Sequence, residues 1–279
     1  MIEKRKVEIV VISDVHLGTY GCKAKELVNY LEGIQPKILV LNGDIIDIWQ
    51  FSKHYFPETH MRVIKTIIAM LANGTEVHYI TGNHDEMLRK FKGFQLSNFK
   101  IVNKLVLPLK TGKAWFFHGD VFDNTMKHAK WIAKLGGKGY DLLILINNVV
   151  NWVSTRLGKG RISLSKKVKD SVKGVSNFVS WFEETASEIA IENGYTYVIC
   201  GHIHQPKIMN YMSKGGEQVT YLNSGDWVEN MTALEYNKDK WVIYHHKFLE
   251  KNINLVNREY SLNEALNYEN LFNEVIKMN

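Results

Sequence analysis

The sequence predicts a layered α/β fold in which helices cover β-sheets. Short apolar runs rich in β-branched residues alternate with segments of helical periodicity from residue 7 onward. Such an order of strand, helix, strand, helix and strand favours parallel strands joined by helices. The chain has 279 residues and is 45% hydrophobic, which is enough apolar material for one large core.

The predicted elements follow one another in a regular order. VEIVVIS (7–13) is the first strand, and a helix follows that stops near Gly33 and Pro36. KILVLNGD (37–44) is the second strand, an amphipathic helix that begins at His60 and ends at Asn73-Gly74 comes next, and the third strand starts at residue 76. IVNKLVLPL and KAWFFHGD predict a hairpin around Thr111-Gly112. Later strands are YTYVIC, QVTYLNSGD, MTALEYN and KWVIYHHKF.

The alternation is interrupted over residues 124–192, where the spacing of apolar residues becomes helical. We interpret this segment as a helical cap inserted into a domain of residues 1–248, which a C-terminal tail of residues 249–279 follows. Residues 126–175 hold eleven basic and two acidic residues, a charge of +9 that leaves −3 for the rest of a chain of net charge +6. Such a block predicts an anionic partner, such as nucleic acid, a membrane surface or a phosphorylated substrate.

Cysteine content and hydropathy bear on the compartment. Only Cys22 and Cys200 occur, far apart in sequence, which fits a reducing compartment and excludes a disulfide framework or a thiolate metal site. The N-terminal residues lack the apolar stretch and cleavage site of a signal peptide. No run of 18 or more apolar residues is present. We therefore expect a cytoplasmic protein without a transmembrane helix.

Five polar signatures each follow an apolar run. They are Asp14-Val15-His16, Gly43-Asp44-Ile45-Ile46-Asp47, Gly82-Asn83-His84-Asp85, His118-Gly119-Asp120 and Gly201-His202-Ile203-His204. Ligands of layered α/β folds bind beyond the carboxyl ends of the strands, so the signatures are expected to converge on one rim. Their mixture of carboxylate, amide and imidazole suits Mn²⁺, Fe or Zn²⁺ better than Mg²⁺. Seven candidate ligands are too many for one ion, which predicts two ions that share a carboxylate and act on a phosphoryl group.

In this order the signatures resemble the motifs of the calcineurin-like metallophosphoesterases, over residues 7–226. The resemblance implies a two-sheet α/β sandwich flanked by helices, and a centre of two divalent ions, Mn²⁺ foremost. The implied ligands are Asp14, His16 and His204 for one ion and Asn83, His118 and His202 for the other, with Asp44 as the bridge. Asn83 would also contact substrate. His84 would contact the scissile phosphate as general acid or charge stabiliser, and Asp47 would orient His84.

A narrower resemblance is to the UDP-2,3-diacylglucosamine pyrophosphatases of the lipid A pathway, which carry a helical cap between the last two motifs. It implies hydrolysis of that nucleotide-sugar lipid to UMP and 2,3-diacylglucosamine 1-phosphate, at the inner face of the inner membrane. The basic cap, with Trp131, Trp152 and Trp181, would meet acyl chains and an anionic membrane surface. Asp123 would contact the sugar. The chain has His84 where the best-known branch has arginine, as a second branch does, which leaves the substrate open.

Three alternatives stay open. The protein is a soluble phosphodiesterase or nuclease whose basic cap binds nucleic acid, or the cap is a packing element with a solvated lysine face, or the fold is a non-catalytic scaffold. The complete ligand set argues against a scaffold, and the helical apolar stripe favours an apolar groove over a nucleic-acid surface. Ile48-Trp49 follows Asp47 where protein phosphatases of the superfamily have Arg-Gly, which argues against that class. No obligate protein partner is indicated.

Overall fold

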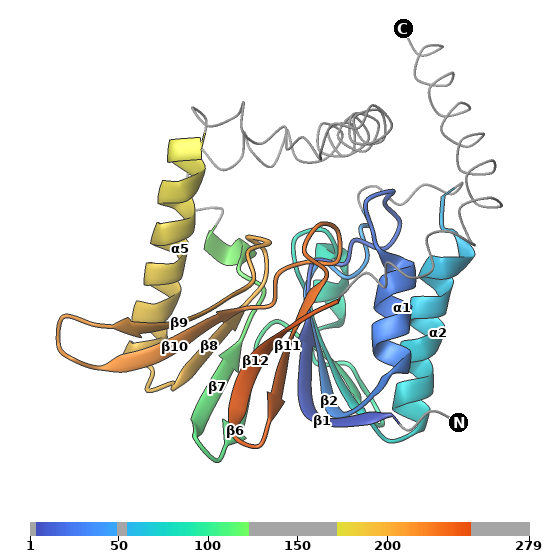
Figure 1. Cartoon of the computed structure of the whole chain (residues 1–279), viewed down its shortest axis with the longest axis horizontal. Coiled ribbons are helices and arrows are strands. Elements are labelled where there is room, and N and C mark those ends of the chain that lie inside the picture. The colour runs from blue at the N-terminus through green and yellow to red at the C-terminus, as the bar shows by residue number, and fades with distance from the viewer. Residues whose placement is uncertain (1–3, 49–54, 123–171, 247–279) are drawn as a thin grey trace, which may run out of the picture. The chain divides into compact units, whose positions relative to one another are not determined.

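The structure, a computed structural model, describes residues 4–48, 55–122 and 172–246. Two β-sheets lie face to face between helices (Figure 1). Helices α1 (Ala24–Glu32) and α2 (Glu58–Ala72) cover the outer face of one sheet, and α5 (Val172–Glu192) covers the outer face of the other. The predicted two-sheet α/β sandwich flanked by helices is therefore confirmed.

The larger sheet has seven strands in the order β12-β11-β1-β2-β3-β5-β4. Their bounds are β1 Arg5–Ile12, β2 Ile34–Asn42, β3 Glu76–Ile80, β4 Gln95–Leu96, β5 Phe99–Val102, β11 Thr232–Asn237 and β12 Lys240–His245. β1, β2, β3 and β5 are parallel, whereas β4, β11 and β12 run antiparallel to their neighbours. The carboxyl ends of β1, β2 and β3 consequently meet at one edge.

The smaller sheet has five strands in the order β6-β7-β8-β10-β9. Their bounds are β6 Leu105–Leu109, β7 Gly112–Phe116, β8 Tyr197–Cys200, β9 Lys207–Met212 and β10 Gln218–Asn223. β6 and β7 form the predicted hairpin, while β7, β8 and β10 are parallel. Two short 3₁₀ helices, η1 (Glu86–Phe91) and η2 (Asp120–Phe122), follow β3 and β7.

The apolar core has three layers. Val10 on β1 belongs to the layer under α1 and α2, whereas its neighbour Val11 belongs to the layer between the sheets. Successive strand residues point to opposite faces, so a strand covered on both faces must be apolar throughout. The third layer lies under α5, where Phe182 and Ala186 pack against the outer face of the smaller sheet. This double coverage explains the continuous apolar runs of the sequence.

Only the end of the segment predicted as a helical insertion is described. α5 forms the outer helical layer of the smaller sheet, so residues 178–192 contribute to the core. Residues 123–171, which carry most of the basic block, lie outside the described ranges, as does the tail from residue 247. Among the helices of the described ranges, none combines the length and apolarity that crossing a bilayer requires.

Candidate metal centre

The five polar signatures come together because each follows a strand whose carboxyl end lies at the same rim. β1, β2 and β3 deliver the first three signatures from the larger sheet, and β7 and β8 deliver the other two from the smaller sheet. Three groups of side chains have ligand atoms within 4.8 Å of one another. The groups are Asp14, His16 and His204; His16, Asp44 and His84; and Asp44, His118 and His202. The sequence expectation of one convergent rim is met.

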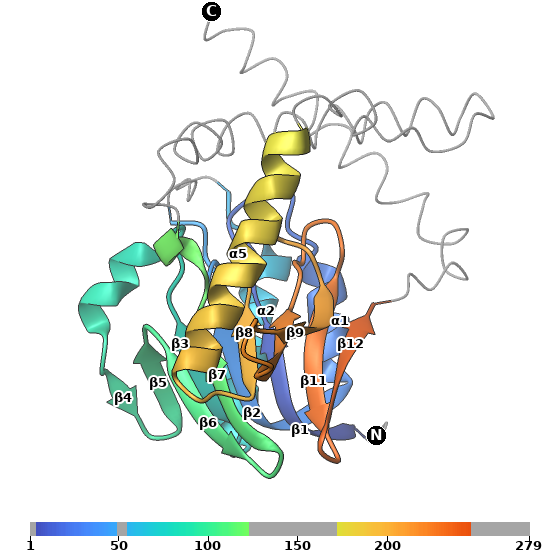
Figure 2. The same ribbon diagram turned by 90° about the vertical axis from the view of Figure 1, so that its left-hand side faces the viewer.

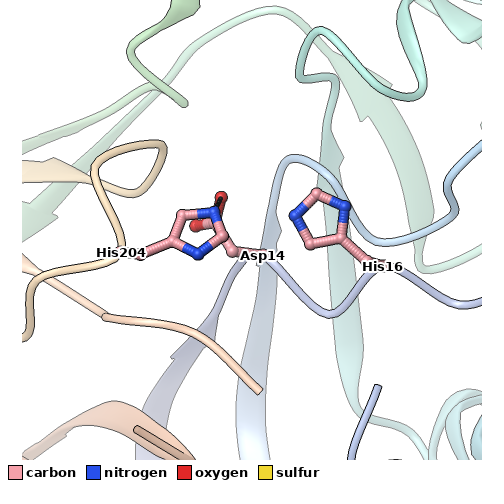
Figure 3. A group of neighbouring side chains, drawn as sticks. All are labelled: Asp14, His16 and His204. Carbon is pink, nitrogen blue, oxygen red and sulfur yellow. Dashed lines mark ion pairs between the residues drawn. The ribbon is translucent and has the colours of Figure 1, made fainter. Parts of the chain in front are cut away.

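The sharing of residues between the groups is informative. His16 belongs to the first two groups and Asp44 to the last two, so the three groups form one continuous cluster. Figure 3 shows the first group, in which His16 and His204 lie beside Asp14 although they come from different sheets. The position of Asp44 between two sets of donors is the one that the predicted bridging ligand requires.

Among the donor residues, two ion pairs cross from one sheet to the other. His204 Nε2 lies 3.1 Å from Asp14 Oδ1, and His118 Nε2 lies 3.2 Å from Asp44 Oδ2. Backbone N–H groups hold the remaining carboxylate oxygens, because His202 donates to Asp14 Oδ2 at 3.0 Å and His84 donates to Asp44 Oδ1 at 2.8 Å. Each buried carboxylate is thus fixed on one side and faces an imidazole on the other.

Hydrogen bonding fixes which nitrogen of His118 faces the centre. Nδ1 of His118 lies 2.9 Å from the carbonyl oxygen of Asn42, and a carbonyl only accepts, so Nδ1 carries the hydrogen. Nε2 faces the Asp44 carboxylate and makes no hydrogen bond with a described residue. A carboxylate oxygen and an imidazole nitrogen face each other stably when a proton or a metal cation lies between them, and Asp44 accordingly raises the pKa of His118 against the effect of burial. The buried atoms Asp14 Oδ1 and His16 Nε2 also make no hydrogen bond within the described ranges, so the donor set fits divalent cations.

The electrostatics favour positive charge at this centre. Burial by itself would raise the pKa of Asp44, but neighbouring imidazoles, His118 foremost, hold that pKa well below its ordinary value. Burial would also raise the pKa of Asp14, but the neighbouring imidazoles, His204 foremost, lower it to about 2. Burial would lower the pKa of His204, yet Asp14 raises it to about 9. The carboxylates are ionised and the imidazoles face negative charge, which stabilises any cation bound among them.

The backbone is strained at these residues. Nine non-glycine residues of the described ranges have a positive φ, and five of them are predicted metal ligands. Their φ angles are +52° at Asp14, +53° at His16, +54° at Asp44, +68° at His202 and +53° at His204. This left-handed conformation costs on the order of 1 kcal/mol per residue, and persists where the surrounding structure enforces it, as at functional sites. The loops turn sharply here so that the side chains point at one spot.

Two glycines of the signatures allow the close packing of the centre. A Cβ atom at Gly43, whose φ is +85°, would overlap the His118 ring, and one at Gly82 would overlap the Asp44 carboxylate. Glycine is needed where the backbone approaches a side chain this closely. The glycines at positions 43 and 82 are therefore explained by the side chains packed against them.

The predicted contact between Asp47 and His84 is present. Nδ1 of His84 donates to Asp47 Oδ2 at 2.8 Å, and Nδ1 of His16 lies 3.4 Å from the same oxygen. Asp47 is buried, whereas 27% of the His84 side chain is exposed. A nitrogen of His84 also lies within the second group of potential metal ligands. The geometry leaves His84 accessible to a substrate, and its role as general acid or charge stabiliser stays a prediction.

The two predicted substrate contacts have different outcomes. Asn83 is half-buried in the loop after β3, next to His84, and its amide oxygen is inside the protein. The backbone N–H of His84, the residue after Asn83, donates a hydrogen bond to the Asp44 carboxylate, so Asn83 lies close to Asp44 along the loop. Asp123 lies outside the described residues.

Sequence reasoning missed residues that hold the loops in place. Asp85 is fully buried and accepts hydrogen bonds from Ile45 N, Tyr79 Oη and Gly82 N. It thereby joins the loop after β2 to the loop after β3. A fully buried aspartate is rare without such partners, but the sequence gives only its place in the Gly-Asn-His-Asp signature.

A second pair of supporting contacts joins loops of different sheets. Arg89 on η1 donates to the carbonyl of Gly82 at 3.3 Å and pairs with Asp120 on η2. Asn230 donates to the carbonyl of His204 at 2.8 Å and to the Asp226 carboxylate. None of these partners is adjacent in sequence, so no local signal could have predicted them.

Comparison with known proteins assigns the family. The profile of the calcineurin-like phosphoesterases matches residues 7–206. A UDP-2,3-diacylglucosamine hydrolase of Aliivibrio fischeri is 25% identical over 86% of this chain and 98% of its own. One of Blochmanniella pennsylvanica is 23% identical over 94% of this chain and 100% of its own. A solved phosphoesterase of E. coli is similar at 14% identity and a TM-score of 0.40, over 86% of this chain and 99% of that one.

The chain belongs to the calcineurin-like phosphoesterase family. With the donor clusters at the rim, this membership makes it a metal-dependent hydrolase that uses divalent ions.

Proposed function

We propose that the protein hydrolyses the diphosphate of UDP-2,3-diacylglucosamine to UMP and 2,3-diacylglucosamine 1-phosphate, a reaction of the lipid A pathway. One observation carries this choice of substrate. Curated relatives named UDP-2,3-diacylglucosamine hydrolase align with the chain over 80–94% of its length in four cases. The described rim supports the reaction class, because its donors fit two cations that share Asp44.

The proposed ligands are those that the sequence indicated. Asp14, His16 and His204 would hold one ion, Asn83, His118 and His202 would hold the other, and Asp44 would bridge them. Mn²⁺ is the ion we favour, with Fe and Zn²⁺ as alternatives, because the donors mix oxygen with imidazole nitrogen and include no thiolate. When bound, such a pair of ions polarises phosphoryl oxygens and lowers the pKa of an attacking water.

The chain's own residues would then position the diphosphate and supply a proton. Asp47 accepts the hydrogen of His84 Nδ1 and so fixes the ring, which leaves Nε2 free to donate to a phosphoryl oxygen. Water adds one oxygen to the attacked phosphorus and releases a proton to solvent, and the bond from that phosphorus to the bridging oxygen breaks. The departing phosphate keeps the electron pair, and a hydrogen bond from His84 would stabilise the charge. Asn83, next to His84, would orient the same phosphate, and Asp123 would contact the sugar.

We further propose that the enzyme acts as a peripheral protein on the cytoplasmic face of the inner membrane. The basic residues of 126–175 would attract the anionic leaflet, at about 1 kcal/mol for each lysine or arginine near the surface. Binding to anionic liposomes should therefore weaken with salt. Neutralising the lysines of this segment should weaken the binding, and unchanged binding would refute this part of the proposal.

The deciding experiment is a Mn²⁺-supplemented hydrolysis assay of UDP-2,3-diacylglucosamine in detergent micelles. His84→Ala should lose turnover by about 10²–10³-fold while metal analysis shows both ions retained. His245→Ala, which removes an exposed histidine at the end of β12, is the matched control and should match the wild type. Unchanged turnover in His84→Ala would remove His84 from the mechanism.

The second candidate is a phosphodiesterase or nuclease that binds nucleic acid through the basic segment. Its charge of +9 over residues 126–175, with Trp131 and Trp152, favours this reading, because single-strand binders combine basic and stacking groups. The same assay includes bis-p-nitrophenyl phosphate and a single-stranded oligonucleotide. Turnover of these two without release of UMP from the lipid would overturn the proposed substrate and keep the metal chemistry.

A further inference from the structure

A run of eight exposed residues follows η1 at one edge of the seven-stranded sheet. Residues 90–97, with the sequence KFKGFQLS, are all exposed, from the end of η1 through β4. The exposed fractions are 57% for Phe91, 47% for Phe94 and 65% for Leu96. Phenylalanine and leucine are usually buried, and neighbouring exposed apolar side chains mark a contact surface. We call residues 90–97 the edge segment.

The charge around the edge segment has one sign. The sequence contains no acidic residue from 87 to 119, whereas Arg89, Lys90, Lys92, Lys100, Lys104, Lys110 and Lys113 are basic. Lys90 and Lys92 flank Phe91 and make no ion pair with a described residue. Lysines interleaved with large apolar side chains are typical of surfaces that enter a lipid interface, where ammonium groups reach phosphates and rings enter the acyl boundary.

The edge segment lies at the outer edge of the larger sheet. It begins six residues after His84 in sequence, and Arg89 of η1 ties it to the loops of the centre through Gly82 and Asp120. β4 is the outermost strand of the seven-stranded sheet, and Figure 2 shows η1 and β4 at one edge of the sandwich. β4 pairs with Phe99 and Lys100 of β5, which lie level with the first residues of β3, so this surface extends along the edge of the sheet away from the carboxyl ends that carry the centre.

We propose that the edge segment docks on an anionic lipid bilayer, with Phe91, Phe94 and Leu96 in the interface and Lys90 and Lys92 on the headgroup phosphates. The proposal rests on the proposed function in that a lipid substrate brings the enzyme to a bilayer. Lipid binding itself needs no turnover, so the two can fail separately. Charge complementarity favours an anionic bilayer over another copy of the chain, which would bring like charges together.

The test measures binding of the full-length protein to sedimented vesicles of phosphatidylcholine with and without phosphatidylglycerol. Phe91→Ser/Phe94→Ser should weaken binding by about tenfold or more, since two large apolar side chains no longer enter the interface. The matched control is Ile68→Ser/Val242→Ser, whose side chains are 57% and 51% exposed on α2 and β12. The control should bind like the wild type.

A charge variant separates attraction from insertion. Lys90→Gln/Lys92→Gln should weaken binding by about tenfold, and only to vesicles with phosphatidylglycerol. Lys37→Gln/Lys65→Gln, at exposed positions elsewhere, should leave it unchanged. All variants should keep the melting temperature and the turnover of bis-p-nitrophenyl phosphate, because none of these side chains lies at the centre.

The outcomes decide between the occupants of the surface. Equal binding by the phenylalanine variant and its control would overturn the proposal, even if the enzyme cleaves the lipid substrate. A wild-type dimer in light scattering that the phenylalanine variant dissociates would assign the surface to a second copy instead. Weakened vesicle binding with no activity on UDP-2,3-diacylglucosamine would uphold this surface and refute the proposed substrate.

Discussion

The two sheets contribute to the centre in different ways. The seven-stranded sheet supplies both carboxylates of the donor groups, Asp14 and Asp44, whereas the five-stranded sheet supplies only imidazoles, from His118, His202 and His204. Within the donor groups, each ion pair between the sheets joins a carboxylate of the first to an imidazole of the second. The larger sheet therefore sets the negative charge that would attract cations, and the imidazoles of the smaller sheet would complete their coordination. A cation bound at the rim would link the two sheets.

The largest effect is expected when the shared carboxylate of the larger sheet is removed. Asp44→Ala should reduce turnover by about 10³-fold, because a carboxylate that bridges two ions contributes several kcal/mol to the transition state. Metal analysis should show fewer than one ion per chain on average. Asp239→Ala, at an exposed turn between β11 and β12, is the control. Two retained ions in Asp44→Ala would disprove the bridging role.

A substitution at the contact between the sheets should destabilise the fold. Gly43→Ala places a Cβ atom in the ring of His118 and imposes a positive φ on alanine. Overpacking and backbone strain together should lower the free energy of unfolding by about 3–4 kcal/mol. Gly74→Ala has the same sign of φ, +92°, with nothing within 4 Å of the new Cβ. It should cost only about 1 kcal/mol.

Urea unfolding of the two alanine variants measures the difference. An equal loss in both would mean that the backbone angle alone matters, and that His118 moves aside without cost. A larger loss at Gly43 would show that the packing of the two sheets at the rim limits the stability.

Helix α2, which covers the larger sheet, carries a histidine whose protonation should change the stability of the fold. His60 on α2 is buried, accepts a hydrogen bond from Gly18 N through Nδ1, and has its pKa lowered from 6.5 to about 4 by burial. The unfolded chain takes up the proton first as the pH falls. Stability should therefore be full above pH 6.5 and fall by about 3 kcal/mol as the pH drops toward 4.

Denaturant unfolding across this pH range tests the prediction. His60→Gln keeps an acceptor for Gly18 and cannot titrate, so its stability should depend less on pH than that of the wild type. His245→Gln changes an exposed histidine and should keep the full dependence. Parallel curves for all three proteins would rule out His60 as the source.

Much of this architecture could be predicted because its signals are local. β1 and β2 are buried on both faces and give continuous apolar runs, β3 gives a buried run that only His78 interrupts, and a polar signature follows each of the three. β9 was not predicted, since its residues alternate between half-buried and exposed and form no apolar run. β2 begins at Ile34, earlier than the predicted start at residue 37. Pro36 is tolerated there because β2 pairs only with β1 until Ile38, where pairing with β3 starts.

At the metal centre, too, some features have a local sequence signal and others depend on tertiary contacts. The sequence named the donors and their convergence, because strand ends with polar residues are visible in one dimension. The left-handed backbone at Asp14 and Asp44, and the burial of Asp85, depend on neighbours that come close only in the folded chain. Contacts between loops of different sheets also depend on the folded chain. The clearest example is the contact of Arg89 with Asp120.

The smallest effect is expected from the Arg89 contact, which joins a loop of the larger sheet to η2 after the smaller sheet's β7. Arg89 also donates to Gly82, next to the packed Asp44 and His118 side chains. Its side chain is 37% exposed and Asp120 is nearly buried. Solvent screening of such a pair limits its contribution, so Arg89→Ala should lower the free energy of unfolding by about 1 kcal/mol.

A metal titration makes this contact informative beyond stability. If the pair holds the two loops together at the rim, Arg89→Ala should weaken Mn²⁺ binding a few-fold, and the double variant with Asp120→Ala should add little more. Arg62→Ala breaks an exposed ion pair with Glu32 at 3.2 Å between α1 and α2, far in sequence from every donor. It should leave metal affinity unchanged. Equal Mn²⁺ affinities for Arg89→Ala and Arg62→Ala would mean that the carboxylates and imidazoles alone set the rim, and that the loops need no bracing between the sheets.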